Sequence, residues 1–207
     1  MEKGKKDMEA YLTCRKAANY LEGLEDITGY KKKMSLLEKS RPVKDALASG
    51  KNLAAREDQL QQQYMEAMVS KDSLWWKNEL AKLNTQINNS GSPDEKSMYK
   101  RVLNYLGMGA YMYTSNAIVN GTPGQAEQFL NVYELVDPEN PDMFFFRASF
   151  YARNGNNSSA LESLKKAAEH GFSDLEKLKG GDPAFSSLRK MKEYEEIMEQ
   201  VSQNAEN

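Results

Sequence analysis

Residues 104–171 of this 207-residue chain carry one pattern written twice, with the second copy 34 positions after the first. The matching pairs share an identity or a chemical type: Gly121/Gly155, Ala126/Ala160, Leu130/Leu164, Ser115/Ser149, Tyr111/Phe145 and Met112/Phe146. An internal repeat of this length predicts two copies of one supersecondary unit that stack on each other.

The second copy has clear start and stop signals for helices. Asn140 followed by Pro141 suits a helix start with Pro at the first helical position. Gly155 ends that helix, because Gly adopts the left-handed conformation without strain. Ser158 or Ser159 is then expected to cap a second helix. Each copy is therefore predicted to be a helix, a tight turn and a second helix, and the chain to be all-α.

Small and aromatic residues in the second copy stand at the spacing of a known pattern: an aromatic residue, a small residue, Tyr, Ala and a bulky apolar residue. Here these positions hold Phe144, Ala148, Tyr151, Ala160 and Leu164. The second copy thus resembles a tetratricopeptide (TPR) repeat, although Arg147 and Phe172 stand where that pattern has Leu and Pro. The first copy resembles a degenerate TPR repeat, with Ala110, Thr114 and Ala117 as weaker equivalents.

The resemblance implies a right-handed α-solenoid of TPR-like antiparallel helix hairpins with a C-terminal capping helix. We expect a TPR-like region at residues 92–207, with hairpins at about 94–136 and 140–171 and a cap at 172–203. Residues 171–189 resemble the closing segment of many bacterial TPR-containing proteins. Residues 1–91 are expected to form an N-terminal helical region, either a bundle or degenerate repeats.

Apolar stripes of helical spacing fill the N-terminal region, and we expect about five helices there, with a break at Ser49 and Gly50. The last of them carries a stripe that includes Trp76, beside Trp75. Packing of at least one of these two tryptophans in the core is the favoured interpretation, and stacking of the pair on a ligand is the alternative.

Charge and apolar content limit the classes of function. The chain has 28 Lys and Arg against 30 Asp and Glu, so it lacks the basic excess expected of an electrostatic nucleic-acid binder. Its longest apolar run, at residues 143–146, is too short for a membrane span. If Met1 is the native start, we expect a cytoplasmic protein; if a signal sequence was removed, we expect a periplasmic or envelope-associated one.

Residues that carry chemistry are scarce. A single cysteine, Cys14, and a single histidine, His170, exclude an internal disulfide and the usual Cys/His zinc clusters. The sequence has no P-loop, no G-x-S-x-G elbow and no dinucleotide-binding glycine pattern. We therefore expect a protein that is not an enzyme, with no catalytic residues, no cofactor and no metal.

In TPR-like arrays the first helix of each hairpin lines a concave groove, and the resemblance carries this role onto one set of residues. The candidate partner-binding residues are Tyr111, Ser115, Ile118, Phe145, Ser149 and Arg153. Tyr111 and Phe145 are expected to form an apolar floor, with Ser149 and Arg153 available to a peptide backbone or carboxylate. The alternative is that the N-terminal helices or the C-terminal tail bury these aromatic residues as core.

Two functions remain open from the sequence. The leading hypothesis is a non-enzymatic protein-protein interaction or scaffold module that binds a peptide or partner protein. The alternative is a small-ligand-binding domain, or an accessory domain of a larger bacterial envelope system, with a pocket between the Trp75-Trp76 helix and the repeats.

Overall fold

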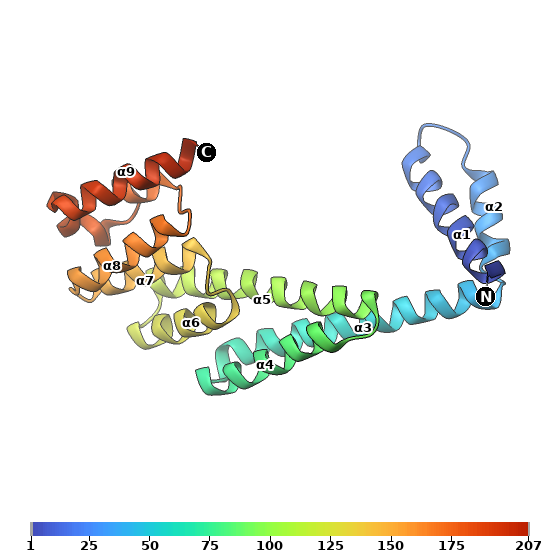
Figure 1. Cartoon of the computed structure of the whole chain (residues 1–207), viewed down its shortest axis with the longest axis horizontal. Helices are drawn as coiled ribbons and strands as arrows, with labels where there is room; N and C mark the ends of the chain where they lie inside the picture. Colours follow the sequence, from blue (N-terminus) through green and yellow to red (C-terminus); the bar gives the residue numbers. More distant parts are fainter. Residues whose placement is uncertain (1, 207) are drawn as a thin grey trace. The chain divides into compact units, whose positions relative to one another are not determined.

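The computed structural model describes residues 2–206; Met1 and Asn207, the outer ends of the two predicted regions, lie outside the described residues. All regular structure in the described part is helical, which confirms the predicted all-α class. The helices pack mainly against their sequence neighbours (Figure 1). They are α1 (Glu2–Leu21), α2 (Thr28–Leu37), α3 (Arg41–Ser70), α4 (Ser73–Asn89), α5 (Pro93–Asn120), α6 (Pro123–Val136), α7 (Pro141–Arg153), α8 (Asn157–Glu169), η1 (Lys177–Gly181), η2 (Pro183–Lys190) and α9 (Lys192–Glu206).

The chain comprises two compact units, residues 1–59 and 60–207, so that α3 contributes residues to both. In the first unit, α1 and α2 lie side by side as an antiparallel pair (Figure 1). Tyr11, Cys14 and Ala18 form the buried face of α1, and the Tyr11 hydroxyl donates to Glu38 over 3.1 Å. The division of the chain near residue 91 stays a prediction.

The predicted break at Ser49 and Gly50 is wrong, because α3 runs without interruption from Arg41 to Ser70. A glycine inside a helix costs only about 1 kcal/mol relative to alanine. The alanines and leucines around it favour the helix enough to offset that cost. Pro42 lies in the first turn of α3, where a missing N–H costs nothing. Four helices therefore precede α5, not about five.

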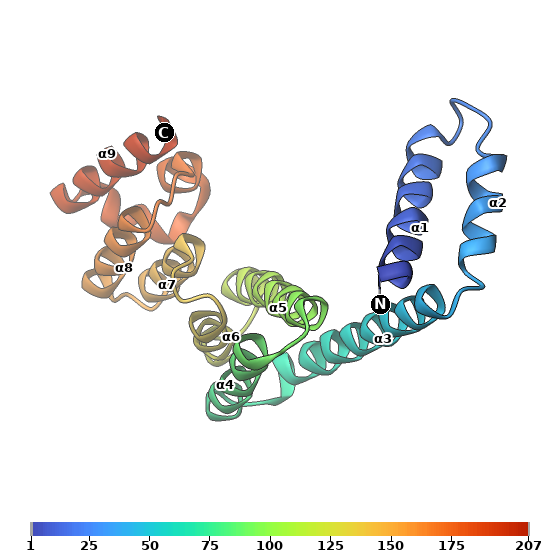
Figure 2. The ribbon, with the colours of Figure 1, turned by 45° about the vertical axis from the view of Figure 1, so that its right-hand side comes forward.

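In the second unit, α5 pairs with α6 and α7 pairs with α8, and α7 also contacts α5 and α6. Figure 2 shows α4, α5 and α6 nearly end-on and side by side. The predicted boundaries agree with the structure at several points. Thr122 and Gln125 form a capping box at the start of α6, and Asn140 caps α7 with Pro141 at the first position. Gly155, with φ of 75°, ends α7.

The cap of α8 differs from the prediction. The Asn156 side chain accepts a hydrogen bond from the backbone N–H of Ser159 over 3.1 Å, so the cap is Asn156 and neither Ser158 nor Ser159. Asparagine holds its carbonyl one atom further from the backbone than serine holds its hydroxyl, and it is an equally good N-cap. The helix therefore begins earlier than the two serines suggested.

Methyl-sized and apolar residues occupy buried places in both hairpins. Ala126 and Leu130 are buried in α6, and Ala160 and Leu164, 34 positions later, are buried in α8. Ala148 in α7 is fully buried as well. A larger side chain at such a contact between helices would overpack it, at about 1–3 kcal/mol.

The C-terminal segment, residues 172–206, is less regular than the C-terminal capping helix that the resemblance implied. A π-helical turn, η1, is followed by a 3-10 segment, η2, and the chain is extended at Met191 before α9 starts. Phe172, Leu178, Phe185 and Leu188 of this segment are buried. The segment packs through η2 on α7 and α8 and through α9 on α8, so it covers one end of the paired helices.

Candidate functional site

The six predicted partner-binding residues divide by helix. On α5, Tyr111 and Ser115 are half-buried, and Ile118 is buried. Tyr111 packs its ring edge-on against Phe146 of α7, with ring centroids 5.2 Å apart. The structure thus brings the α5 part of the predicted groove against the second hairpin, with Tyr111 partly accessible.

On α7, Phe145 is covered by the C-terminal segment of the same chain. Its ring stacks on Phe172, with centroids 4.9 Å apart and planes 6° apart. Phe185 packs edge-on from another side at 5.6 Å, and the Lys177 ammonium lies 5.4 Å from the Phe145 ring centroid. The aromatic residue expected on the groove floor is therefore core in this hairpin, as in the alternative in which the tail buries it.

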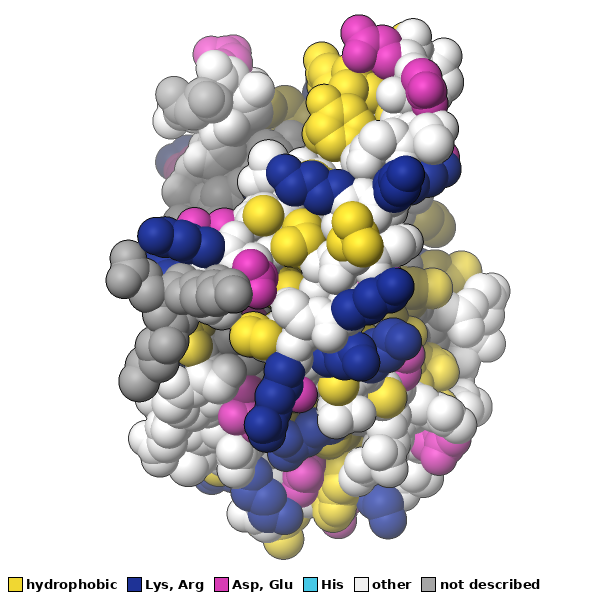
Figure 3. Space-filling view, turned by 90° about the vertical axis from the view of Figure 1, so that its right-hand side faces the viewer, with side chains coloured by type: hydrophobic (Ala, Val, Ile, Leu, Met, Phe, Trp, Pro, Cys, Tyr) yellow, Lys and Arg dark blue, Asp and Glu magenta, His cyan; other side chains and the backbone are white. Residues whose placement is uncertain are grey.

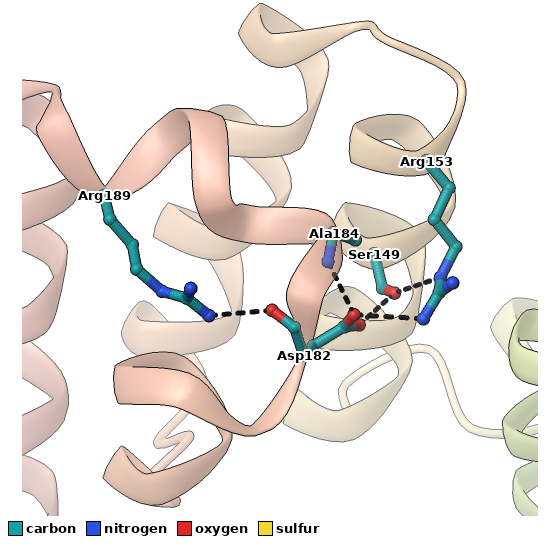
Figure 4. A network of polar contacts seen from close by, with 5 residues as sticks. All are labelled: Ser149, Arg153, Asp182, Ala184 and Arg189. Atoms are coloured by element: carbon teal, nitrogen blue, oxygen red, sulfur yellow. Dashed lines mark hydrogen bonds and ion pairs between the residues drawn. The ribbon is translucent and has the colours of Figure 1, made fainter.

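Ser149 and Arg153 are also engaged within the chain, by Asp182 (Figure 4). The Ser149 hydroxyl donates to the Asp182 carboxylate, and Arg153 forms an ion pair with that carboxylate over 3.0 Å. The backbone N–H of Ala184 donates to it over 2.9 Å, and the Arg189 side chain donates to the Asp182 carbonyl over 2.8 Å. The carboxylate that Ser149 and Arg153 were expected to recognise is thus supplied in the same chain by Asp182.

One side of α5 carries exposed apolar side chains. Met108, Met112 and Val119 are 60%, 67% and 65% exposed, and their spacings of four and seven residues place them on one side of the helix. We call these three residues the α5 face. Large apolar side chains gathered in this way on a surface mark interaction sites more often than single exposed ones do.

Beside the α5 face lies a cavity of about 510 Å³, lined mainly by Met65, Tyr105, Met108, Met112 and Tyr113. Gly109 leaves room for the end of the Met65 side chain of α3, since a Cβ at Gly109 would lie 2.5 Å from Cε of Met65. Met65 and Tyr105 are not among the residues that the repeat pattern predicted for a binding surface. Their contribution depends on how α3 packs on α5, and no local pattern in the sequence signals that contact.

A second cavity, of about 450 Å³, lies where α5 meets the end of α6 and the start of α7. Tyr111, Tyr133, Asp137, Asn140 and Asp142 line its polar side. We call this cavity the Tyr133 pocket. Burial, followed by the nearby carboxylates of Asp142 and Asp137, raises the pKa of the Tyr133 hydroxyl. The pocket therefore combines neutral phenol groups with acidic side chains.

The two tryptophans are part of the packing around α4. Trp76 is fully buried and lies against Tyr64, with ring centroids 5.9 Å apart. Trp75 packs edge-on against Trp76 at 5.1 Å. Trp76 is therefore part of the core of the second unit, and the half-buried Trp75 packs against it.

The remaining chemical candidates also have structural roles. His170 stacks on Phe144 at 4.6 Å, and its Nδ1 lies 3.3 Å from the Glu139 carboxylate. Within residues 2–206, no three His, Cys, Asp or Glu side chains are grouped so that they can hold a metal ion. In the same part of the chain, no helix is both long and apolar enough to cross a bilayer. On the face that Figure 3 draws, Lys and Arg side chains are spread among acidic, apolar and uncharged ones.

Comparison with known proteins found no protein-family model, no curated protein and no solved structure that matches this chain. The site is therefore interpreted from its own geometry.

Proposed function

We propose that this chain is a non-enzymatic protein-protein interaction or scaffold module that binds a peptide or partner protein. In this proposal the paired helices α5–α6 and α7–α8 are two TPR-like hairpins of a right-handed α-solenoid, and the C-terminal segment is its cap. The 34-residue repeat supports it, as does the burial of Ala126 and Ala160 at matching places.

The observation that carries the proposal is the α5 face. The C-terminal segment covers Phe145 and Ser149 in the α7 part of the predicted groove, so the accessible part of that predicted groove lies on α5. Methionine side chains such as Met108 and Met112 are flexible and polarisable, and they adapt to apolar partners of different shapes. A row of such residues beside a cavity suits the apolar side of an amphipathic helix or peptide.

Affinity capture from the source organism with matched variants tests the proposal. A chain that carries Met108→Glu and Met112→Glu is expected to lose the protein that the wild-type chain captures, because two carboxylates cannot be buried in an apolar interface without a partner. Leu74→Glu is the control, since Leu74 on α4 is 68% exposed and Met112 is 67% exposed. Equal capture by the double variant and the wild-type chain would count against the proposal.

The Tyr133 pocket favours a second candidate, a small-ligand-binding or accessory domain of a larger bacterial envelope system. Its volume of about 450 Å³ lies in the range of ligand sites, and it holds a few convergent polar groups within apolar walls. Native mass spectrometry of the protein purified from its source tests this candidate. A reproducible mass increase of a few hundred daltons would support it, and a bare chain in every preparation would argue against it.

A further inference from the structure

The Tyr133 pocket holds a polar group without a partner. The Tyr133 side chain is 1% exposed, with its ring between those of Tyr111 and Phe146. Its hydroxyl forms no hydrogen bond with any residue that the structure describes. The hydroxyl oxygen is not fully enclosed by protein, so the small exposed area of Tyr133 includes it. Tyr133 lines the pocket, and we take the oxygen to face that space. A buried hydroxyl of this kind normally has a partner.

The carboxylates that line the Tyr133 pocket are not fully balanced by neighbouring cations. Asp137 accepts a hydrogen bond from the Asn140 amide over 2.8 Å, and among residues 2–206 it has no ion-pair partner. Asp142 faces the Lys177 ammonium over 3.4 Å, but Asp174 shares that ammonium over 3.5 Å. The Lys177 ammonium is therefore shared by two carboxylates, those of Asp142 and Asp174, while Asp137 has no cation of the described residues beside it. The two carboxylates that line the pocket, Asp137 and Asp142, favour a further positive charge.

Apolar side chains also line the pocket. They are Leu103, Met108 and Val136, and Gly107 beside them leaves the backbone of α5 without a side chain. A Cβ at Gly107 would lie 3.8 Å from the Asp137 carboxylate, so α5 and the acidic wall are near each other. The pocket thus has room for a narrow apolar stem between its walls and hydrogen-bond acceptors on its polar side.

We propose that the Tyr133 pocket binds an ammonium or guanidinium group carried on an apolar stem. The Tyr133 hydroxyl and the Asp137 carboxylate accept its N–H groups, and the stem lies along Leu103 and Val136. Burial is the main cause of the raised pKa of Tyr133, and the Asp142 and Asp137 carboxylates add to it; only this second cause would also favour a bound cation. The bound cation has two possible sources. If it is a Lys or Arg side chain of a partner protein, the assignment rests on the proposed function. If it is a free amine, the chemistry at the site is the same.

Titrations of the full chain, followed by amide chemical shifts in NMR, separate these sources. One arm uses 1,5-diaminopentane. The other uses a short acetylated peptide with one lysine, against the same peptide with norleucine, which keeps the stem and lacks the ammonium. All arms share one ionic strength, because salt screens the attraction. Saturable shifts around residues 107, 133 and 137 are expected with the amine and the lysine peptide, and none with the norleucine peptide.

Two conservative variants test the residues. Tyr133→Phe keeps the ring and removes only the hydroxyl, and Asp137→Asn keeps the shape and removes the charge. Each is expected to weaken binding by about fivefold or more. Tyr113→Phe, on α5 but outside this pocket, and Glu199→Gln, exposed on α9, are the matched controls and should bind as the wild-type chain does. Thermal melts confirm that each variant is folded, and if Asp137→Asn fails to fold, Tyr133→Phe decides alone.

The outcomes are distinct. No saturable shift in either arm, or wild-type affinity in Tyr133→Phe, overturns the cation site. Loss of partner capture in a chain with Met112→Glu alone, which changes no residue of this pocket, would still support the proposed function. Binding of the diamine without the lysine peptide supports the site and overturns the peptide as its source. Binding of both, weakened in both test variants, supports the assignment in full.

Discussion

At the scale of single residues, roles that depend on sequence neighbours could be predicted, and roles that depend on distant parts of the chain could not. Asn140 and Gly155 lie at the ends of helices, as the sequence predicted, because caps and stops depend on neighbouring residues only. Asp182 is the opposite case. Its place before Pro183 signals the start of a segment, and the η2 cap is local, but its bonds with Ser149 and Arg153 span about 30 positions.

At this scale Tyr64 gives a prediction for alkaline pH. Burial first, and then the adjacent Glu79, raises the pKa of Tyr64 to about 12, from about 10 in an unfolded chain. Because the folded-state pKa is the higher one, this contribution to stability is complete below pH 10 and is lost as pH rises through about 12. We expect urea unfolding to show a smaller loss of stability from pH 9 to pH 11 in Tyr64→Phe than in the wild-type chain.

The control for that measurement is Tyr20→Phe, since Tyr20 is 81% exposed and should behave as the wild-type chain does. An identical pH dependence in Tyr64→Phe and the wild-type chain would show that Tyr64 does not titrate in this window.

Among the secondary-structure elements, the helices followed from apolar periodicity, and their interruptions were less predictable. Gly50 was expected to end a helix, and α3 continues through it because a single glycine costs too little to stop a favourable stretch. The π turn at Lys177–Gly181 and the 3-10 segment at Pro183–Lys190 were not predicted as such. In these two turns Leu178 and Phe185 are buried against other elements. The spacing of apolar residues alone does not specify that packing.

The attachment of this C-terminal segment to α7 gives a prediction for an element. Asp182→Ala removes the acceptor of the buried Ser149 hydroxyl, the ion-pair partner of Arg153 and the N-cap of η2. We expect the free energy of unfolding to fall by about 1–3 kcal/mol. Hydrogen exchange should rise in residues 177–190 before it rises in α5.

Glu199→Ala is the control for that change, because Glu199 is exposed on α9. If exchange in residues 177–190 is the same in Asp182→Ala and in the wild-type chain, the carboxylate does not hold the segment on α7.

For the whole molecule, the sequence predicted the all-α class and the two helix pairs, α5–α6 and α7–α8, from one repeat. The sequence could not decide which part of the predicted groove is covered by the rest of the chain. Aromatic residues are expected both in an open binding groove and in a core that the tail covers. In the structure Phe145 and Ser149 are covered by the C-terminal segment, whereas Met108 and Met112 on α5 are exposed. Recognition of a partner through the α5 face remains the proposal that this distribution supports.

Site-specific photo-cross-linking in the source organism tests that proposal most directly. A photoreactive amino acid at Met112, and separately at Met108, should trap one and the same protein. The same amino acid at Glu162, exposed on α8 away from this face, should not trap it. If Met108 and Met112 trap no common protein, or trap only what Glu162 also traps, the α5 face is not a partner-binding surface.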